Sequence, residues 1–162
     1  MSDELILAII DRANGSANSA IQLLSQEVIA PDITFAEVEV RQLLSSYSGK
    51  EEHTSLDNFY LIRHAGEYAA AIQDAEAGDL HWVVAPAFRG KGILPPALQK
   101  AVLPHLFQSR EWQQVTISRG VAGDFFEASK QVARKAGFME IYSTKDEFIF
   151  QILKPGIQPR NG

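Results

Sequence analysis

The sequence predicts a single α/β (α+β) domain, with a mixed, mostly antiparallel sheet flanked by helices. Three patterns support this fold class. Residues 58–64 and 67–73 are β-favouring runs on either side of Ala65-Gly66, which is a hairpin signal. A strand, a glycine turn and a helix follow between residues 78 and 107. Residues 139–143 and 148–153 have the composition of a closing hairpin.

The beginning of the chain is predicted to be helical. The apolar residues between Leu5 and Ile10 have helical spacing, and Asn14-Gly15 would end such a helix. A short buried strand is the alternative for this brief run. Residues 17–29 place Ile21, Leu24 and Val28 on one stripe, which predicts a second helix.

A third helix is predicted after Thr34, because Thr34 and Glu37 have the spacing of a capping box. Residues 45–57 are polar and are expected to form a mobile loop, either a plain connection or a lid. The domain would therefore have a helical N-terminal part at 1–57 and a core at 58–153. Residues 154–162 contain two prolines and two glycines, and they predict a flexible tail.

The chain is organised around the strand at Leu80–Val84 and the helix predicted from Ala97 onward. Arg89 to Gly92 forms a cationic glycine turn between them. Backbone N–H groups at a turn that enters a helix, together with the positive end of the helix dipole, favour a phosphate or diphosphate. Pro95 and Pro96 fit a first helical turn, where a missing N–H costs no intrahelical hydrogen bond.

The rest of the chain alternates strands with helices. Pro104 should kink or shorten the helix that follows the glycine turn. Residues 114–118 are then predicted to form a strand and residues 125–135 a helix. Phe125 and Phe126 are expected in the core.

Composition narrows the classes of function. The chain has 162 residues, a net charge of −5 and no cysteine, which excludes disulfides, thiolate zinc sites and a cysteine nucleophile. An acidic chain disfavours nucleic acid and mildly favours a cationic substrate. The longest apolar run, at residues 5–10, is too short to cross a bilayer, so no membrane association and a cytoplasmic location are expected. Oligomeric state stays open, with a homodimer the commonest assembly by base rate.

Two motifs give a family resemblance. The run from Val84 to Leu94, VAPAFRGKGIL, resembles the acetyl-coenzyme A signature of the GNAT superfamily of N-acetyltransferases. In that signature Arg or Gln is followed by two residues, Gly, one residue and a small residue, and the segment wraps a diphosphate. This chain departs from the signature at Leu94, which stands where the family has Gly or Ala.

The run from Ala128 to Phe138, ASKQVARKAGF, is similar to the later helix and exit turn of the GNAT subgroup that includes ribosomal-protein alanine acetyltransferases. The two motifs occur in order, about forty residues apart. The resemblance covers roughly residues 58 to 153. It also implies that the predicted N-terminal helices form the wall facing the acceptor.

The resemblance implies a set of cofactor contacts. In the family, the strand before the glycine turn binds the pantetheine arm through its backbone, and the turn amides hold the diphosphate. For acetyl-coenzyme A, the corresponding residues of this chain are Trp82, Val83, Val84, Arg89, Gly90, Lys91, Gly92, Ile93 and Leu94.

The catalytic candidates are Asp79, His81 and Ser129. Relatives often carry an acidic residue at the position of Asp79, and an imidazole such as that of His81 can accept a proton at neutral pH. Many relatives place a leaving-group tyrosine where this chain has Ala133. The subgroup offers the serine corresponding to Ser129 instead, and it tends to have Asn where this chain has Phe126.

Each candidate also has a structural interpretation. Asp79 can simply end a turn, a strand histidine often packs in the core, and a helical serine can bond its own helix. Arg89 and Lys91 suit a solvated turn equally well. No two histidines lie at ligand spacing, so no metal site is predicted.

The leading functional hypothesis is an acetyl-coenzyme A-dependent N-acetyltransferase, in which a primary amine of a small molecule or peptide attacks the thioester directly. The alternative is a catalytically inactive GNAT-fold module that binds a ligand or another protein. A phosphate-binding protein of another class ranks lower, because the chain lacks a complete P-loop and a dinucleotide-binding glycine pattern.

Overall fold

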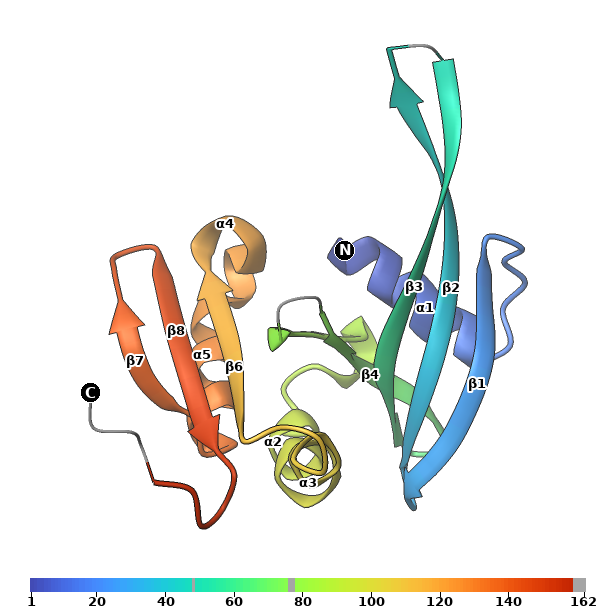
Figure 1. The fold of residues 1–162 in the computed structure, drawn as a ribbon. Coiled ribbons are helices and arrows are strands. Elements are labelled where there is room, and N and C mark those ends of the chain that lie inside the picture. Colours follow the sequence, from blue (N-terminus) through green and yellow to red (C-terminus); the bar gives the residue numbers. More distant parts are fainter. Residues whose placement is uncertain (48, 76–77, 159–162) are drawn as a thin grey trace. The chain divides into compact units, whose positions relative to one another are not determined.

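The computed structural model describes residues 1–47, 49–75 and 78–158 (Figure 1). It contains helices, a five-stranded antiparallel sheet and a three-stranded antiparallel sheet, which confirms the mixed α and β class. The chain divides into two compact units. Unit 1 is Met1–Ala75 with Trp82–Lys91, and unit 2 is Glu76–His81 with Gly92–Gly162.

The larger sheet is built from consecutive strands in the order β1-β2-β3-β4-β5. Its elements, preceded by helix α1, are α1 (Asp3–Ala13), β1 (Ile21–Ala30), β2 (Ile33–Ser46), β3 (Gly49–His64), β4 (Glu67–Asp74) and β5 (Leu80–Val84). The predicted hairpin at residues 58–73 and the predicted strand at 80–84 are therefore confirmed.

Helix α1 covers one face of this sheet, as its spacing predicts. Ser2 caps its first turn by accepting a hydrogen bond from the Leu5 N–H. Ile6, Ile9 and Ile10 are fully buried, and they belong to the same core cluster as residues of β2, β3 and β4. Burying each isoleucine contributes about 1.5–3 kcal/mol, so this face is a main source of stability for unit 1.

The predicted helices at 17–29 and 34–44 are wrong, and so is the helical character of residues 17–57. In β2, Ala36, Val38 and Val40 are buried, while Glu37 and Glu39 between them are partly exposed. That alternation has the period of a strand, and it outweighed the capping-box spacing. Thr34 caps no helix, since its buried hydroxyl pairs with the Tyr68 hydroxyl at 3.2 Å.

The predicted loop at residues 45–57 is wrong as well. Strands β2 and β3 stay paired from Arg41↔Thr54 to Ser46↔Gly49. Pairing of β1 with β2 stops at Val40, and pairing of β4 with β3 starts only at Asn58. Between these two residues, β2 and β3 pair only with each other and form a two-stranded arm. We call residues 41–57 the β-arm.

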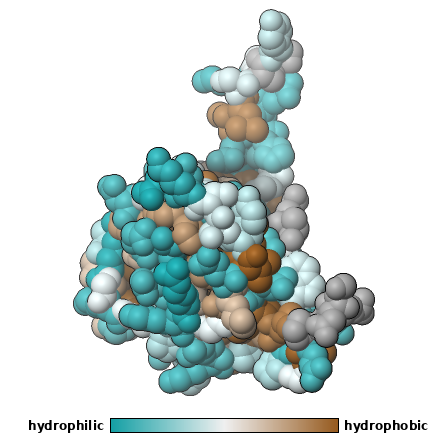
Figure 2. All heavy atoms as spheres, turned by 90° about the vertical axis from the view of Figure 1, so that its left-hand side faces the viewer, coloured by the Kyte–Doolittle hydropathy of each residue, from teal (hydrophilic) through white to brown (hydrophobic). Residues whose placement is uncertain are grey.

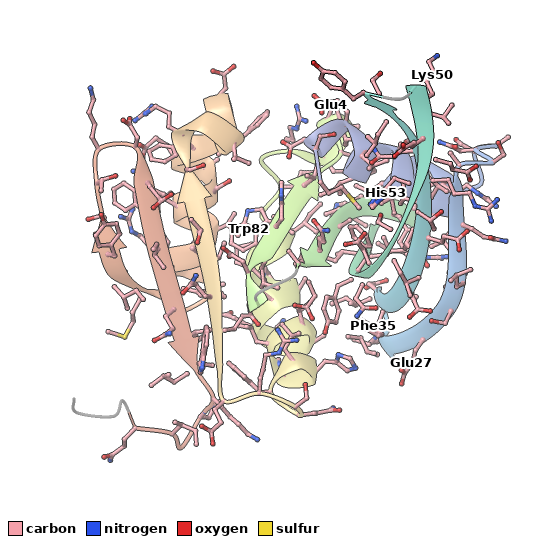
Figure 3. The ribbon with its side chains drawn as sticks, turned by 45° about the horizontal axis from the view of Figure 1, so that its top comes forward. Glu4, Glu27, Phe35, Lys50, His53 and Trp82 are labelled. Carbon is pink, nitrogen blue, oxygen red and sulfur yellow. The ribbon has the colours of Figure 1, made fainter. Side chains whose placement is uncertain are left out.

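The β-arm projects from the sheet as a ribbon in Figure 1, and Figure 3 shows Lys50 toward its tip and Phe35 at the opposite end of the same strand pair. Leu43 is 69% exposed and Leu56 is 59% exposed. Figure 2 shows apolar side chains between hydrophilic ones on the arm. None of the described arm residues contributes a buried side chain.

Unit 2 contains one continuous helical segment at residues 94–106. It consists of α2 (Leu94–Ala97), a π-helical stretch η3 (Leu98–Val102) and α3 (Leu103–Leu106). Pro104 has no N–H to donate to the preceding turn, which accords with a widened helix directly before it. The predicted disturbance at Pro104 thus takes the form of a π segment within a helix that continues.

The smaller sheet has the order β6-β8-β7. The remaining elements are β6 (Trp112–Ser118), α4 (Arg119–Ala122), η4 (Gly123–Phe125), α5 (Phe126–Lys135), β7 (Met139–Ser143) and β8 (Glu147–Leu153). These bounds confirm the predicted strand at 114–118, the helix at 125–135 to within a residue, and the closing hairpin.

An aromatic cluster fills the core between α5 and β8. Phe126 is 2% exposed, as predicted for the core, whereas Phe125 is 42% exposed and that prediction is wrong. The buried Lys130 extends over the Phe126 and Phe148 rings, with Nζ 4.6 Å and 4.2 Å from their centroids. Its charge is balanced by Glu127 at 2.8 Å.

The predicted tail is described as far as Gln158 and has no helix or strand there. Its last four residues lie outside the described part. In the described ranges, every helix falls short of the length and apolarity that crossing a bilayer requires.

We expect the β-arm to be dispensable for folding. Replacing residues 42–53 with Asn-Gly would close β2 on β3 with a two-residue turn and should change the free energy of unfolding by no more than about 1 kcal/mol. Urea unfolding followed by circular dichroism measures this. Ile9→Ala is the control, because removing that buried side chain should cost about 2–5 kcal/mol. A loss of that size on arm removal would show that the arm belongs to the folding core.

Candidate functional site

The glycine turn after β5 depends on left-handed backbone torsions. β5 ends at Val84, a short 3₁₀ turn η2 (Pro86–Phe88) follows, and the helical segment begins at Leu94. Gly90 and Gly92 have φ angles of +73° and +65°. A Cβ atom would meet nothing within 4 Å at either position, so torsion and not crowding requires glycine here.

The amides of this turn are open. Within the described ranges, the N–H groups of Gly90, Lys91, Gly92 and Ile93 donate to no protein acceptor. The first three of these residues are exposed and Ile93 is half-buried. Successive backbone N–H groups that lack a protein acceptor can bind an anion.

The helix end contributes less to this donor set than the sequence suggested. Pro95 and Pro96 stand in the first helical turn and supply no N–H. Leu94 is 3% exposed, so its side chain is buried instead of covering the turn. The donors available to an anion therefore belong to the turn itself, and the departure from the family signature at Leu94 does not obstruct them.

Strand β5 is the last strand of the five-stranded sheet. A single parallel bridge joins Asp79 to Gln114, and after it no ladder is formed on the outer edge of β5 within the described part. Val83 is buried in the cluster beneath α1, while Trp82 and Val84 are half-buried on the other face (Figure 3). An open strand edge presents N–H and C=O groups to a bound chain.

Arg89 is anchored at the end of this strand. Its Nε donates a hydrogen bond to the Val84 carbonyl at 3.2 Å, and the residue is exposed. The guanidinium is thereby held beside the turn. Sequence alone left a free solvated arginine equally open.

Asp79 has a structural partner. Its Oδ1 accepts a hydrogen bond from the Thr116 N–H at 2.8 Å, which ties the turn before β5 to β6 within unit 2. The buried side chain of Gln113 reinforces the same junction by donating to the carbonyls of Gly78 and Gln114. Asp79 therefore positions the start of β5, a role that its sequence position alone did not reveal.

The other catalytic candidates also lie in unit 2. His81 is half-buried on β5, and Ser129 is half-buried on α5. The Ser129 hydroxyl forms no hydrogen bond to the described residues, so its own helix does not use it. Asp79 and Ser129 share no hydrogen bond with each other. Ala133, at the position where many GNAT acetyltransferases have tyrosine, is fully buried and serves packing.

The structure adds residues that sequence reasoning missed. Phe88 lies just before the turn. Its ring contacts Lys91 in the turn and His64 at the end of β3. In the sequence, the only indication of this cluster is that Phe88 is followed within three positions by two cationic residues. In the residues that can be searched, no group of three or more His, Cys, Asp or Glu side chains is arranged to hold a metal ion.

No protein-family model matches the chain, and no curated protein matches it significantly.

We expect Asp79→Ala to destabilise the protein. It would leave the Thr116 N–H without its acceptor, which should cost about 1–3 kcal/mol of unfolding free energy. Asp79→Asn keeps an oxygen acceptor and should lose less than half as much. Urea unfolding of the two variants measures the difference, and equal stability of both variants and the parent would contradict the structural role of this carboxylate.

Proposed function

We propose that this chain is an acetyl-coenzyme A-dependent N-acetyltransferase of the GNAT type. The observation that carries the proposal is the set of open amides from Gly90 to Ile93, in the segment that resembles the family's diphosphate-binding signature. Cofactor, reaction and family all rest on this segment together with the second motif on α5.

The residues fit the cofactor in two ways. The turn amides would hold the diphosphate, with the anchored Arg89 adding a positive charge beside them. The outer edge of β5 at Trp82–Val84 forms no ladder with the described residues, although the Val84 carbonyl accepts from Arg89. This edge would bind the pantetheine arm through the backbone, as an added strand binds a sheet edge. When bound, acetyl-coenzyme A would supply the acetyl group as a thioester.

In the transfer itself, no covalent bond forms between the protein and the acetyl group. The amine nitrogen bonds to the acetyl carbon, the carbon–sulfur bond breaks, the nitrogen loses a proton and the thiolate gains one. His81 and Asp79 are our candidates to accept the amine proton, and the Asp79 carboxylate also accepts a hydrogen bond from the Thr116 N–H. Ser129 is the candidate donor to the thiolate, since its hydroxyl is not spent on the described residues.

A second candidate function is cofactor binding without catalysis. Two observations favour it. The helices expected to face the acceptor are strands β1 and β2, and the usual tyrosine position holds the buried Ala133. Neither observation concerns the glycine turn. A protein with this second function would therefore still bind acetyl-coenzyme A but would not transfer the acetyl group.

We expect Gly92→Asp to abolish most acetyl-coenzyme A binding. A carboxylate beside the diphosphate should weaken binding at least about tenfold. The substitution also places a side chain at a φ of +65°, which strains the turn. Gly92→Asn is therefore the matched control: it carries the same strain in a similar shape without the charge and should bind more tightly than Gly92→Asp.

Isothermal titration of the parent and both variants measures this effect. A parent protein that is folded but binds no acetyl-coenzyme A contradicts both candidate functions. Equal binding by the Asp and Asn variants contradicts the placement of the diphosphate at the turn.

Catalysis is tested separately by thiol release. With acetyl-coenzyme A and a panel of amines and peptides, we expect a rate above the uncatalysed background for the acceptor class, and we expect His81→Ala to lower that rate while leaving cofactor binding within about twofold. Tight cofactor binding without thiol release for any amine in the panel would favour the binding module.

A further inference from the structure

Two side chains in unit 1, those of Lys91 and His64, contact one aromatic ring next to the glycine turn. Lys91 Nζ lies 5.4 Å from the centroid of the Phe88 ring. The His64 ring meets Phe88 edge-on, with centroids 5.8 Å apart and planes at 80°. His64 ends β3 and Lys91 is in the turn, so residues distant in sequence are held on a common anchor.

The two side chains are accessible to a ligand, since both His64 and Lys91 are exposed. Across the described ranges, neither forms an ion pair, although Glu67 is opposite His64 in the β3–β4 register. Unit 1 is otherwise acidic, with Glu and Asp outnumbering Lys and Arg. A local positive site on an acidic unit attracts an anion selectively to that place.

The position of Lys91 relates this site to the turn. Its backbone N–H is one of the four open amides, and its side chain extends from there to Phe88. Suppose that the diphosphate of a ligand occupies the turn. An anionic group attached to the sugar next to that diphosphate would then lie near Lys91. In coenzyme A this group is the phosphate monoester on the 3′-oxygen of the ribose.

We propose that His64 and Lys91, held on Phe88, bind the ribose 3′-phosphate of coenzyme A. This inference rests on the proposed function and deepens it, because it assigns the residues that distinguish coenzyme A from the same molecule without that phosphate. Phe88 acts as a positioning residue for both side chains. The Lys91 ammonium would supply a charge-assisted hydrogen bond, and an imidazole N–H of His64 would supply a second hydrogen bond.

The test compares binding of coenzyme A and 3′-dephospho-coenzyme A in phosphate-free buffer. The parent should prefer coenzyme A, and His64→Gln and Lys91→Gln should each reduce that preference about fivefold, as expected for exposed ion pairs. Phe88→Leu should also reduce it, because the side chains of His64 and Lys91 both lose their contact with the ring. His53→Gln and Lys50→Gln are the controls, since they remove the same residue types from the β-arm, and they should leave the preference unchanged.

The outcomes separate this inference from the proposed function. If the parent binds both ligands with equal affinity, the 3′-phosphate site is wrong and the cofactor assignment stands. An equal loss of both ligands in Lys91→Gln places that side chain on the diphosphate and overturns the inference. If neither ligand binds the folded parent, the proposed function fails and takes the inference with it.

Discussion

The candidate site depends on two glycines that adopt left-handed torsions in the turn after β5. A residue with a side chain is strained at the φ angles of Gly90 and Gly92, and in this backbone conformation the successive amides have no partner among the described residues. Pro95 and Pro96 reinforce the arrangement, because they begin the helix without adding N–H groups. The hydrogen-bond donors available to an anion therefore come from the turn more than from the end of the helix.

Hydrogen bonds fix both ends of β5, the strand that precedes this turn. Ala85 N–H donates to the Ala69 carbonyl, and Arg89 donates to Val84, so the chain leaving β5 is fixed to unit 1. At the start of β5, Asp79 accepts from Thr116 within unit 2. Asp79, one of the two candidate bases, thus also has a positioning role.

Local patterns were sufficient to predict the elements after residue 57 because their signals agree. The hairpin at Ala65-Gly66 has a positive φ at both residues, as its sequence indicates, and the strands around it are buried. Phe126 is in the core where an amphipathic helix places it. The two stretches that resemble GNAT motifs fall on a turn and on helix α5.

Residues 17–57 were predicted wrongly because two periodicities compete there. Ile21, Leu24 and Val28 have helical spacing, yet Leu24 and Val28 are largely exposed on an edge strand. The β-arm could not be predicted, since Leu43 and Leu44 are paired with Glu52 and Glu51 and have no buried face to specify a strand pattern. Contacts through space, such as Phe88 with His64, leave no signal in local sequence.

The central claim is that the turn amides bind the diphosphate of acetyl-coenzyme A. The most direct measurement is a ¹⁵N–¹H correlation spectrum of the labelled protein during a titration with acetyl-coenzyme A. We predict that the resonances of Gly90, Lys91, Gly92 and Ile93 shift the most, because their N–H groups gain a charged acceptor. Saturable binding that leaves these four resonances unmoved would contradict the account.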